Sequence, residues 1–228
     1  MKKIYLLTTV VVLAILAGCK KNTNEPTSGG NTSNPDWAKS DNFVIVELNE
    51  ACSTIGCKLS DLTPLESKGW KITDEGKYIH MENTIDKVEV VMNCYINDTE
   101  TIFHTTCSLS PQAGSVLNSL SYVKSAVETL SSAFLFPTSE TCTFRLLTYR
   151  NITSNKNHTI TDYGKALAAI DNNEYNYSII WADMQSTDYD ELSDALWFGD
   201  ATGLNLGFYM LSEGACLVSM EVTSKKYY

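Results

Sequence analysis

Basic side chains are scarce in this chain of 228 residues, which has 17 lysines and arginines against 27 aspartates and glutamates and a formal net charge of −10. Proteins that bind nucleic acid, or that adhere to anionic lipid by charge alone, need clustered positive charge. The charge balance therefore argues against a nucleic-acid partner and against a purely electrostatic attachment to a bilayer.

Histidine is rarer still, and the sequence signatures of common catalytic sites are missing. The three histidines, His80, His104 and His158, are separated by more than twenty residues, so none forms a metal-binding pair at helical spacing. No Gly-x-Ser-x-Gly motif, phosphate-binding loop or dinucleotide fingerprint occurs. These motifs therefore assign no catalytic, cofactor-binding or metal-binding residues, and we expect no cofactor.

Long apolar runs are missing as well. The longest runs from Ile4 to Leu16 and has 13 residues, whereas a membrane-spanning helix needs about 20. It follows Lys2 and Lys3 and ends in small residues, which is the three-part pattern of an export leader. We expect an exported chain without a membrane-spanning helix.

The end of this leader, Leu16-Ala17-Gly18-Cys19, resembles the lipobox of bacterial lipoproteins. The resemblance implies that residues 1–18 are a signal peptide, that Cys19 is acylated with a fatty acid such as palmitate, and that the new amino terminus is acylated too. Two or more acyl chains attach a protein stably to a bilayer, whereas one binds marginally. The alternative is an ordinary secretory leader followed by a chance cysteine. Loss of the two leader lysines would change the charge from −10 to −12, so acylation would have to hold the chain to the membrane.

Residues 19–40 are rich in Asn, Thr, Ser, Gly and Pro and are expected to form a flexible tether, while 41–228 have the length of a single globular domain. A polar tether before an acidic chain with many Tyr and Asn residues is similar to uncharacterised lipoproteins of gut Bacteroidota. That similarity implies an outer-membrane location. The residues after Cys19 lack the acidic run that such bacteria often use for surface display, so the periplasmic and surface faces both stay open.

The apolar spacing in 41–228 predicts an α+β fold with a mainly antiparallel sheet built of hairpins. One long amphipathic helix is expected over about 111–134, with Ser110 as its N-cap and Pro111 at its first position. Extended segments are expected at 43–48, 70–73, 77–81, 87–97, 101–109, 141–150, 175–183, 204–211 and 215–223.

Shorter helices have readable starts. Asp188 and Glu191 resemble a capping box, which predicts a helix from there to about Trp197. Two further short helices are expected, at 163–170 after a cap at Thr161 and at 63–69.

Six cysteines follow the lipobox, and an exported chain can form disulfides. A hairpin turn at 97–100 would pair Val88 with Leu109 and would put Cys94 and Cys107 on one apolar face, four residues out of register. That offset is about 13 Å, beyond the roughly 7 Å that a disulfide can span between alpha carbons. We therefore interpret most of the cysteines as small hydrophobic core residues. The members of this group are Cys94, Cys107, Cys142 and Cys216.

The state of the two other cysteines stays open. Cys52 and Cys57 lie between structured segments, where a local bridge is plausible and a zinc pair is disfavoured because the spacing is wrong and no histidine lies near. In the carboxyl-terminal hairpin, a loop at 212–214 with a glycine would pair Met210 with Cys216.

An acidic segment, 183–200, is the strongest candidate for chemistry. Its carboxylates could attract calcium or act as an acid and base pair. The alternative is a solvated helix end in which some of them cap the helix. The six residues are Asp183, Asp188, Asp190, Glu191, Asp194 and Asp200.

Aromatic side chains are the second candidate. Tyr175, Tyr177 and Trp181 alternate along one strand with Ile179 between them. Such rings can stack on a sugar, but a two-residue period is first of all typical of a core face. Core packing is the preferred interpretation.

These observations lead to a hypothesis with two alternatives. The first is a non-catalytic envelope lipoprotein whose domain binds a protein or a glycan, attached to the bilayer through acylated Cys19. One alternative is a hydrolase that uses carboxylates in 183–200. The other is a structural or assembly subunit of an envelope complex.

Overall fold

A computed structural model describes residues 36–171, 174–211 and 215–228. The expected signal peptide, Cys19, most of the expected tether and the hairpin loop at 212–214 lie outside these residues. Within the described ranges no helix has the length and apolar character needed to cross a bilayer.

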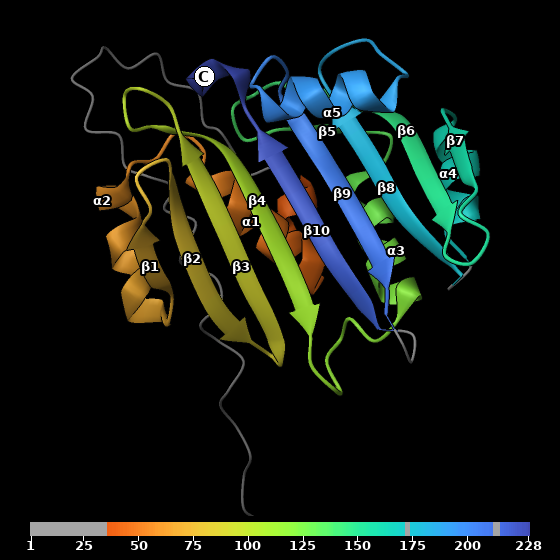
Figure 1. The fold of residues 1–228 in the computed structure, drawn as a ribbon, viewed down its shortest axis with the longest axis horizontal. Helices are drawn as coiled ribbons and strands as arrows, with labels where there is room; N and C mark the ends of the chain where they lie inside the picture. Colours follow the sequence, from red (N-terminus) through yellow and green to blue (C-terminus); the bar gives the residue numbers. More distant parts are fainter. Residues whose placement is uncertain (1–35, 172–173, 212–214) are drawn as a thin grey trace, which may run out of the picture.

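The described strands form one antiparallel sheet in the order β1-β2-β3-β4-β10-β9-β8-β6-β5, with β7 beside β6 (Figure 1). This confirms the α+β class and the mainly antiparallel sheet. The strands are β1 (Lys71–Asp74), β2 (Tyr78–Ile85), β3 (Val88–Ile96), β4 (Ile102–Pro111), β5 (Ala133–Leu135), β6 (Thr141–Asn151), β7 (Asn157–Ile160), β8 (Tyr175–Ala182), β9 (Gly203–Met210) and β10 (Cys216–Thr223).

Helices cover one face of the sheet, and a single helix crosses the end of the other. In Figure 1, α1 and α3 lie behind the sheet, whereas α5 lies at its upper end. The helical elements are η1 (Asp36–Lys39), α1 (Phe43–Thr54), α2 (Leu59–Leu62), η2 (Thr63–Lys68), α3 (Leu120–Leu130), α4 (Tyr163–Ala169), α5 (Tyr189–Trp197) and η4 (Lys225–Tyr227). We call the side opposite α1 and α3 the open face.

The segment 43–48, expected to be a strand, is the start of α1. Asn42 caps this helix, because its side-chain oxygen accepts a hydrogen bond from the Val44 amide at 3.0 Å. The β-branched run misled the prediction, since Val44, Leu48 and Ala51 continue at helical spacing and are fully buried. Burial against β4 and β10 outweighs the weak local preference for a strand.

The expected long helix over 111–134 is wrong at both ends. Only Leu120–Leu130 is helical, while Pro111 ends β4 and Phe134 belongs to β5. Ser110 therefore continues a strand and caps nothing. Ser131 stops the helix with φ 60° and ψ −166°, and its carbonyl accepts a hydrogen bond from the Trp181 indole at 3.0 Å.

The shorter helices agree better with the sequence. The capping box at Asp188 is confirmed in its first half, because the Asp188 carboxylate accepts a hydrogen bond from the Glu191 amide at 3.0 Å. The helix at 163–170 is confirmed as α4, but its cap is Asp162 and not Thr161.

Both predicted hairpins exist, and the register of one was wrong by two residues. Val88 pairs with Pro111 and Cys94 with Thr105, whereas Leu109 had been expected opposite Val88. The shift of two keeps every side chain on its predicted face. In the carboxyl-terminal hairpin, Met210 pairs with Cys216 as predicted.

The cysteines of the sheet are core residues. Cys94, Cys107, Cys142 and Cys216 are free and buried, which confirms their interpretation as small hydrophobic groups. Cys52 is also a free, buried thiol. The expected local bridge between Cys52 and Cys57 is therefore not formed.

The folded region begins before residue 41, where the domain had been expected to start. Trp37 in η1 is buried, donates a hydrogen bond from its indole to the Leu135 carbonyl at 2.9 Å, and packs edge-on against Phe134 at 5.6 Å. A residue with these contacts belongs to the core and not to a tether.

Candidate functional site

The open face is polar, although its side chains are only partly exposed. Strand pairing forms a row of side chains from Asn205 on β9 through Glu221 and Thr106 to Asn93 and His80 on β2. Each of these five side chains is half-buried. The His80 Nδ1 and Asn93 Oδ1 atoms are 2.9 Å apart, so neighbours in the row bond to one another across strands.

The helix α5 positions one end of this row. Its Leu192 and Leu196 pack on Leu146 and Ile180, which are apolar residues of β6 and β8 on the open face. Gly203 lets the helix approach, since a Cβ atom there would collide with the Trp181 carbonyl oxygen and with Leu196. The helix therefore covers only this end of the open face and leaves the rest of it uncovered.

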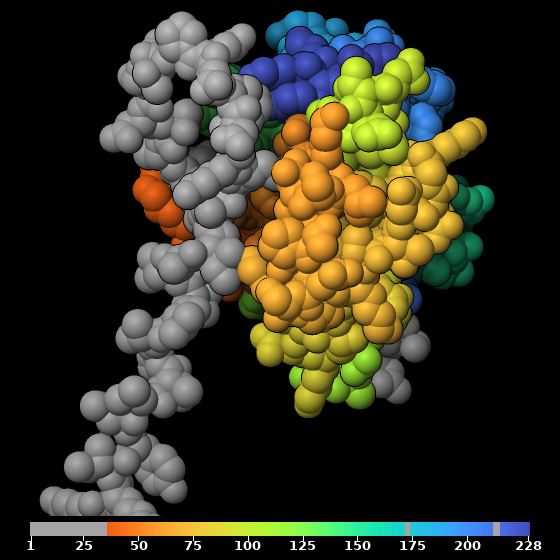
Figure 2. All heavy atoms as spheres, turned by 90° about the vertical axis from the view of Figure 1, so that its left-hand side faces the viewer, coloured from red at the N-terminus to blue at the C-terminus, as the bar shows by residue number. Residues whose placement is uncertain are grey.

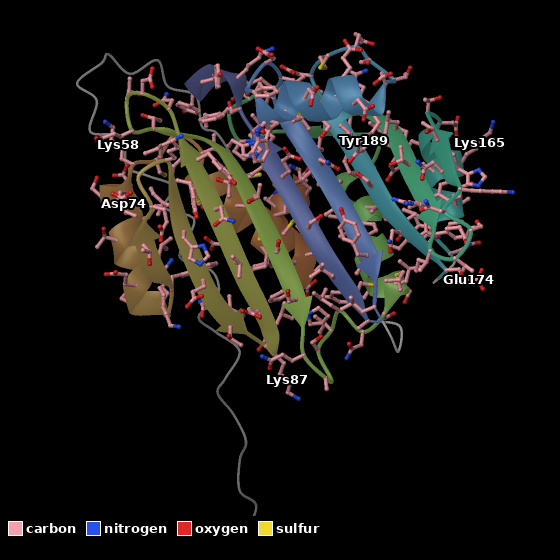
Figure 3. The ribbon with its side chains drawn as sticks, in the orientation of Figure 1. Lys58, Asp74, Lys87, Lys165, Glu174 and Tyr189 are labelled. Carbon is pink, nitrogen blue, oxygen red and sulfur yellow. The ribbon has the colours of Figure 1, made fainter. Side chains whose placement is uncertain are left out.

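Beside α5, hydrogen bonds join polar groups of β8, β9 and β10. The Ser178 hydroxyl donates to Asn205 Oδ1 at 2.7 Å, and the Asn205 amide donates to Glu221 Oε2 at 3.4 Å. The other carboxylate oxygen of Glu221 lies 3.7 Å from His104 Nε2 on β4. Tyr189, labelled in Figure 3 at the start of α5, lies 3.5 Å from the Ser178 oxygen.

Aromatic rings border this polar group. The Trp197 ring at the end of α5 lies 4.9 Å from the His104 ring and 5.2 Å from the Tyr95 ring, in edge-to-face geometry. Tyr78 extends the cluster at 5.5 Å from Tyr95. The Trp197 side chain is 44% exposed, so it keeps a free apolar surface next to the polar groups. We call the set Tyr95, His104, Ser178, Trp197, Asn205 and Glu221 the α5 site.

The electrostatics of the α5 site leave a carboxylate without a cationic partner. Burial lowers the pKa of His104 to about 4, and the nearby Leu196 carbonyl offsets only part of that effect, so the imidazole is neutral at pH 7. Its Nε2 atom is fully buried and makes no hydrogen bond of normal geometry. Burial also raises the pKa of Glu221, and the Asn205 amide opposes this rise. Within the described residues, the ion-pair contact of Glu221 is with this neutral histidine.

Three of the six carboxylates in the acidic segment 183–200 make specific contacts. Asp183 forms an ion pair with Lys225 and accepts a hydrogen bond from the Thr202 amide at 3.0 Å. Asp188 caps α5, and the Glu191 carboxylate accepts from the Ser186 hydroxyl at 2.6 Å. In the described part of the chain, no three His, Cys, Asp or Glu side chains gather as a metal site would require. These contacts favour the interpretation of the segment as a capped helix end.

The alternating aromatic strand lies in the core. Tyr177, Ile179 and Trp181 are buried on the helix-covered face of β8, and Tyr175 is half-buried at its end. The preferred core interpretation is confirmed. Neither this strand nor the acidic segment had pointed to His104, Asn205 or Glu221.

A shallow depression of about 330 Å³ lies at the other end of the open face. Its lining is polar and includes the ion pair between Lys71 and Glu82, at 2.7 Å. The exposed Glu89 carboxylate is also part of the lining. Unlike the α5 site, this depression has no aromatic lining.

No protein-family model matches this chain, and neither a curated protein nor a solved structure shows significant similarity to it.

Proposed function

We propose that this chain is an envelope lipoprotein held to the outer membrane through acylated Cys19, and that its domain is a non-catalytic module that binds a glycan at the α5 site. The lipobox supports the anchor. The observation that carries the binding function is the exposed Trp197 ring beside the connected side chains of Ser178, Asn205 and Glu221. An aromatic face next to directed hydrogen-bonding groups matches a sugar ring, which has an apolar face and polar edges.

The two alternatives have less support from the described contacts. A hydrolase would need paired carboxylates, but Asp183 and Asp188 already serve an ion pair and a helix cap. Assembly through strand addition needs an open sheet edge of some length. The outer strands β1, β5 and β7 have only three or four residues each, and in Figure 2 the β1 edge lies beside α2 and η2.

A protein partner remains the competing occupant of the open face, and a binding measurement distinguishes it from a glycan. We expect the full chain in detergent to bind envelope oligosaccharides in titration calorimetry. Trp197→Ala should weaken this binding at least tenfold because the stacking surface is lost. Leu135→Ala is the control, since this side chain is 45% exposed but belongs to β5, outside the α5 site. Equal effects of the two substitutions would argue against the α5 site.

The anchor has its own test. We expect mass spectrometry of the wild-type chain from its native membrane to find an acylated amino-terminal Cys19 and no residues 1–18. Cys19→Ala should abolish both acylation and cleavage before residue 19. An unmodified residue 19 in the wild type would contradict the lipoprotein proposal.

A further inference from the structure

The α5 site has an unsatisfied charge, and this narrows the chemistry of its ligand. The Glu221 side chain is 16% exposed, so water screens its charge only partly. One oxygen accepts from the Asn205 amide at the long distance of 3.4 Å, and the other faces His104 Nε2 at 3.7 Å. The carboxylate therefore has spare hydrogen-bonding capacity and no positive charge beside it in the described structure.

The facing histidine does not supply the missing charge. His104 is 1% exposed, and its Nδ1 lies 2.7 Å from the Thr223 hydroxyl. Its Nε2 is buried near the Leu196 backbone, makes no hydrogen bond of normal geometry and lies 3.7 Å from the Glu221 carboxylate. The neutral imidazole thus leaves the Glu221 carboxylate, the more exposed of the two groups, without a compensating charge. Burying such groups without partners costs free energy, which a ligand could recover.

The aromatic rings of the α5 site also favour a positively charged ligand. The faces of Trp197 and Tyr95 carry the negative part of the ring quadrupole, which attracts a cation. His104 lies between the two features, with its ring 4.9 Å from the Trp197 ring and its Nε2 atom 3.7 Å from the Glu221 carboxylate. One compact ligand can therefore contact both the carboxylate and the ring.

We infer that the saccharide bound at the α5 site carries a protonated amine, whose ammonium group lies against Glu221 while the sugar ring stacks on Trp197. This inference rests on the proposed glycan-binding function and adds the charge of the ligand. The ammonium group supplies the positive charge that the site lacks and donates to the carboxylate. The remaining hydroxyl groups of the sugar reach Ser178 and Asn205, whose side chains are already aligned by their mutual hydrogen bond.

The test compares sugars that differ only in this charge. The full chain in detergent is titrated at pH 7 with oligomers of glucosamine, galactosamine and mannosamine, each as the free amine and as the N-acetylated form. We expect at least one free-amine oligomer to bind ten times more tightly than its N-acetylated form. Glu221→Gln should remove this preference, so that the free amine and the N-acetylated form bind the variant with equal affinity.

Two controls keep the result interpretable. Glu221→Gln should keep the melting temperature of the wild type, since the amide replaces a carboxylate whose charge is disfavoured by burial. Glu89→Gln removes a charge at the distant depression of the same face and should change neither affinity. An effect of Glu89→Gln in place of Glu221→Gln would overturn the assignment of the site.

The remaining outcomes separate this inference from the proposed function. If both forms of a sugar bind equally and Trp197→Ala weakens both, the glycan function stands and the amine preference is overturned. If only a lysine-rich peptide binds in a Glu221-dependent way, the partner is a protein and both proposals fail. Binding of none of these sugars, to a chain with a normal melting temperature, would overturn both as well.

Discussion

The two faces of the same strands obey different requirements. On the helix-covered face, residues such as Val90, Leu206 and Val218 are fully buried against helices, and their burial explains their presence. On the open face, the half-buried Glu221 lies beside a neutral His104, whose buried Nε2 makes no hydrogen bond of normal geometry. Folding alone does not favour such groups, because each is removed from water at a cost. The contrast supports the proposal that the binding site lies on the open face.

The largest expected effect is the difference in stability between two tryptophan substitutions, one on each face of the sheet. Trp181→Ala on the helix-covered face should lower the free energy of unfolding by about 3–5 kcal/mol, because this ring is completely buried and bonded to Ser131. Trp197→Ala on the open face should cost about 1–2 kcal/mol, because this ring is 44% exposed and loses only edge-to-face contacts with His104 and Tyr95. Urea denaturation measures both. Similar losses would mean that the open face is as important for folding as the core.

The helix-covered side of the sheet has one exception to this contrast, because an ionisable side chain is buried there. Glu47 on α1 is 2% exposed, and its Oε2 atom has no hydrogen-bond partner. Burial, with a smaller contribution from Glu50, raises its pKa from 4.5 to about 8. Because the folded state holds this proton more tightly than the unfolded state, the contribution of Glu47 to stability is highest below pH 4.5 and falls as pH rises to about 8.

Glu47→Gln should remove most of this pH dependence. Each pKa unit corresponds to about 1.4 kcal/mol, so the wild type should lose a few kcal/mol between pH 5 and pH 9 through this group. The variant should be the more stable protein at pH 9, where the buried carboxylate is ionised. Urea denaturation at pH 5, 7 and 9 measures the difference, with the exposed Glu66→Gln as the control. Parallel pH profiles for wild type and Glu47→Gln would contradict the buried-acid explanation.

The difference between the two faces of the strands also explains which elements of the fold the sequence could predict. The two-residue period located eight of the ten strands and kept every predicted hairpin side chain on its correct face, even where the register of β3 and β4 was wrong. It failed for α1, whose apolar run is buried on nearly all sides and thus has no clear period. The short edge strands β5 and β7 were missed because three or four residues carry too little pattern.

The α5 site was harder to predict than the fold. The predicted pairing of Met210 with Cys216 already implies that Asn205 faces Glu221, so one contact of the site was accessible from sequence. The approach of His104 depends on the order of β4 beside β10, two strands more than a hundred residues apart. The position of Trp197 depends on α5 folding back over the open face through Gly203. Neither arrangement leaves a local signal.

The smallest expected effect concerns the start of α5, the helix that makes the two ends of the open face differ. Asp188→Ala should lower the free energy of unfolding by about 0.5–2 kcal/mol because the Glu191 amide loses its acceptor. Asp188→Asn should be nearly neutral, since asparagine caps a helix about as well. A carboxylate that binds calcium would behave differently: Asp188→Asn would keep the fold but abolish a calcium-dependent rise in melting temperature. We expect no such rise in millimolar calcium, for wild type or variant. A rise of several degrees that Asp188→Asn removes would make the acidic segment a functional site and would move the search for function from the open face to the loop before α5.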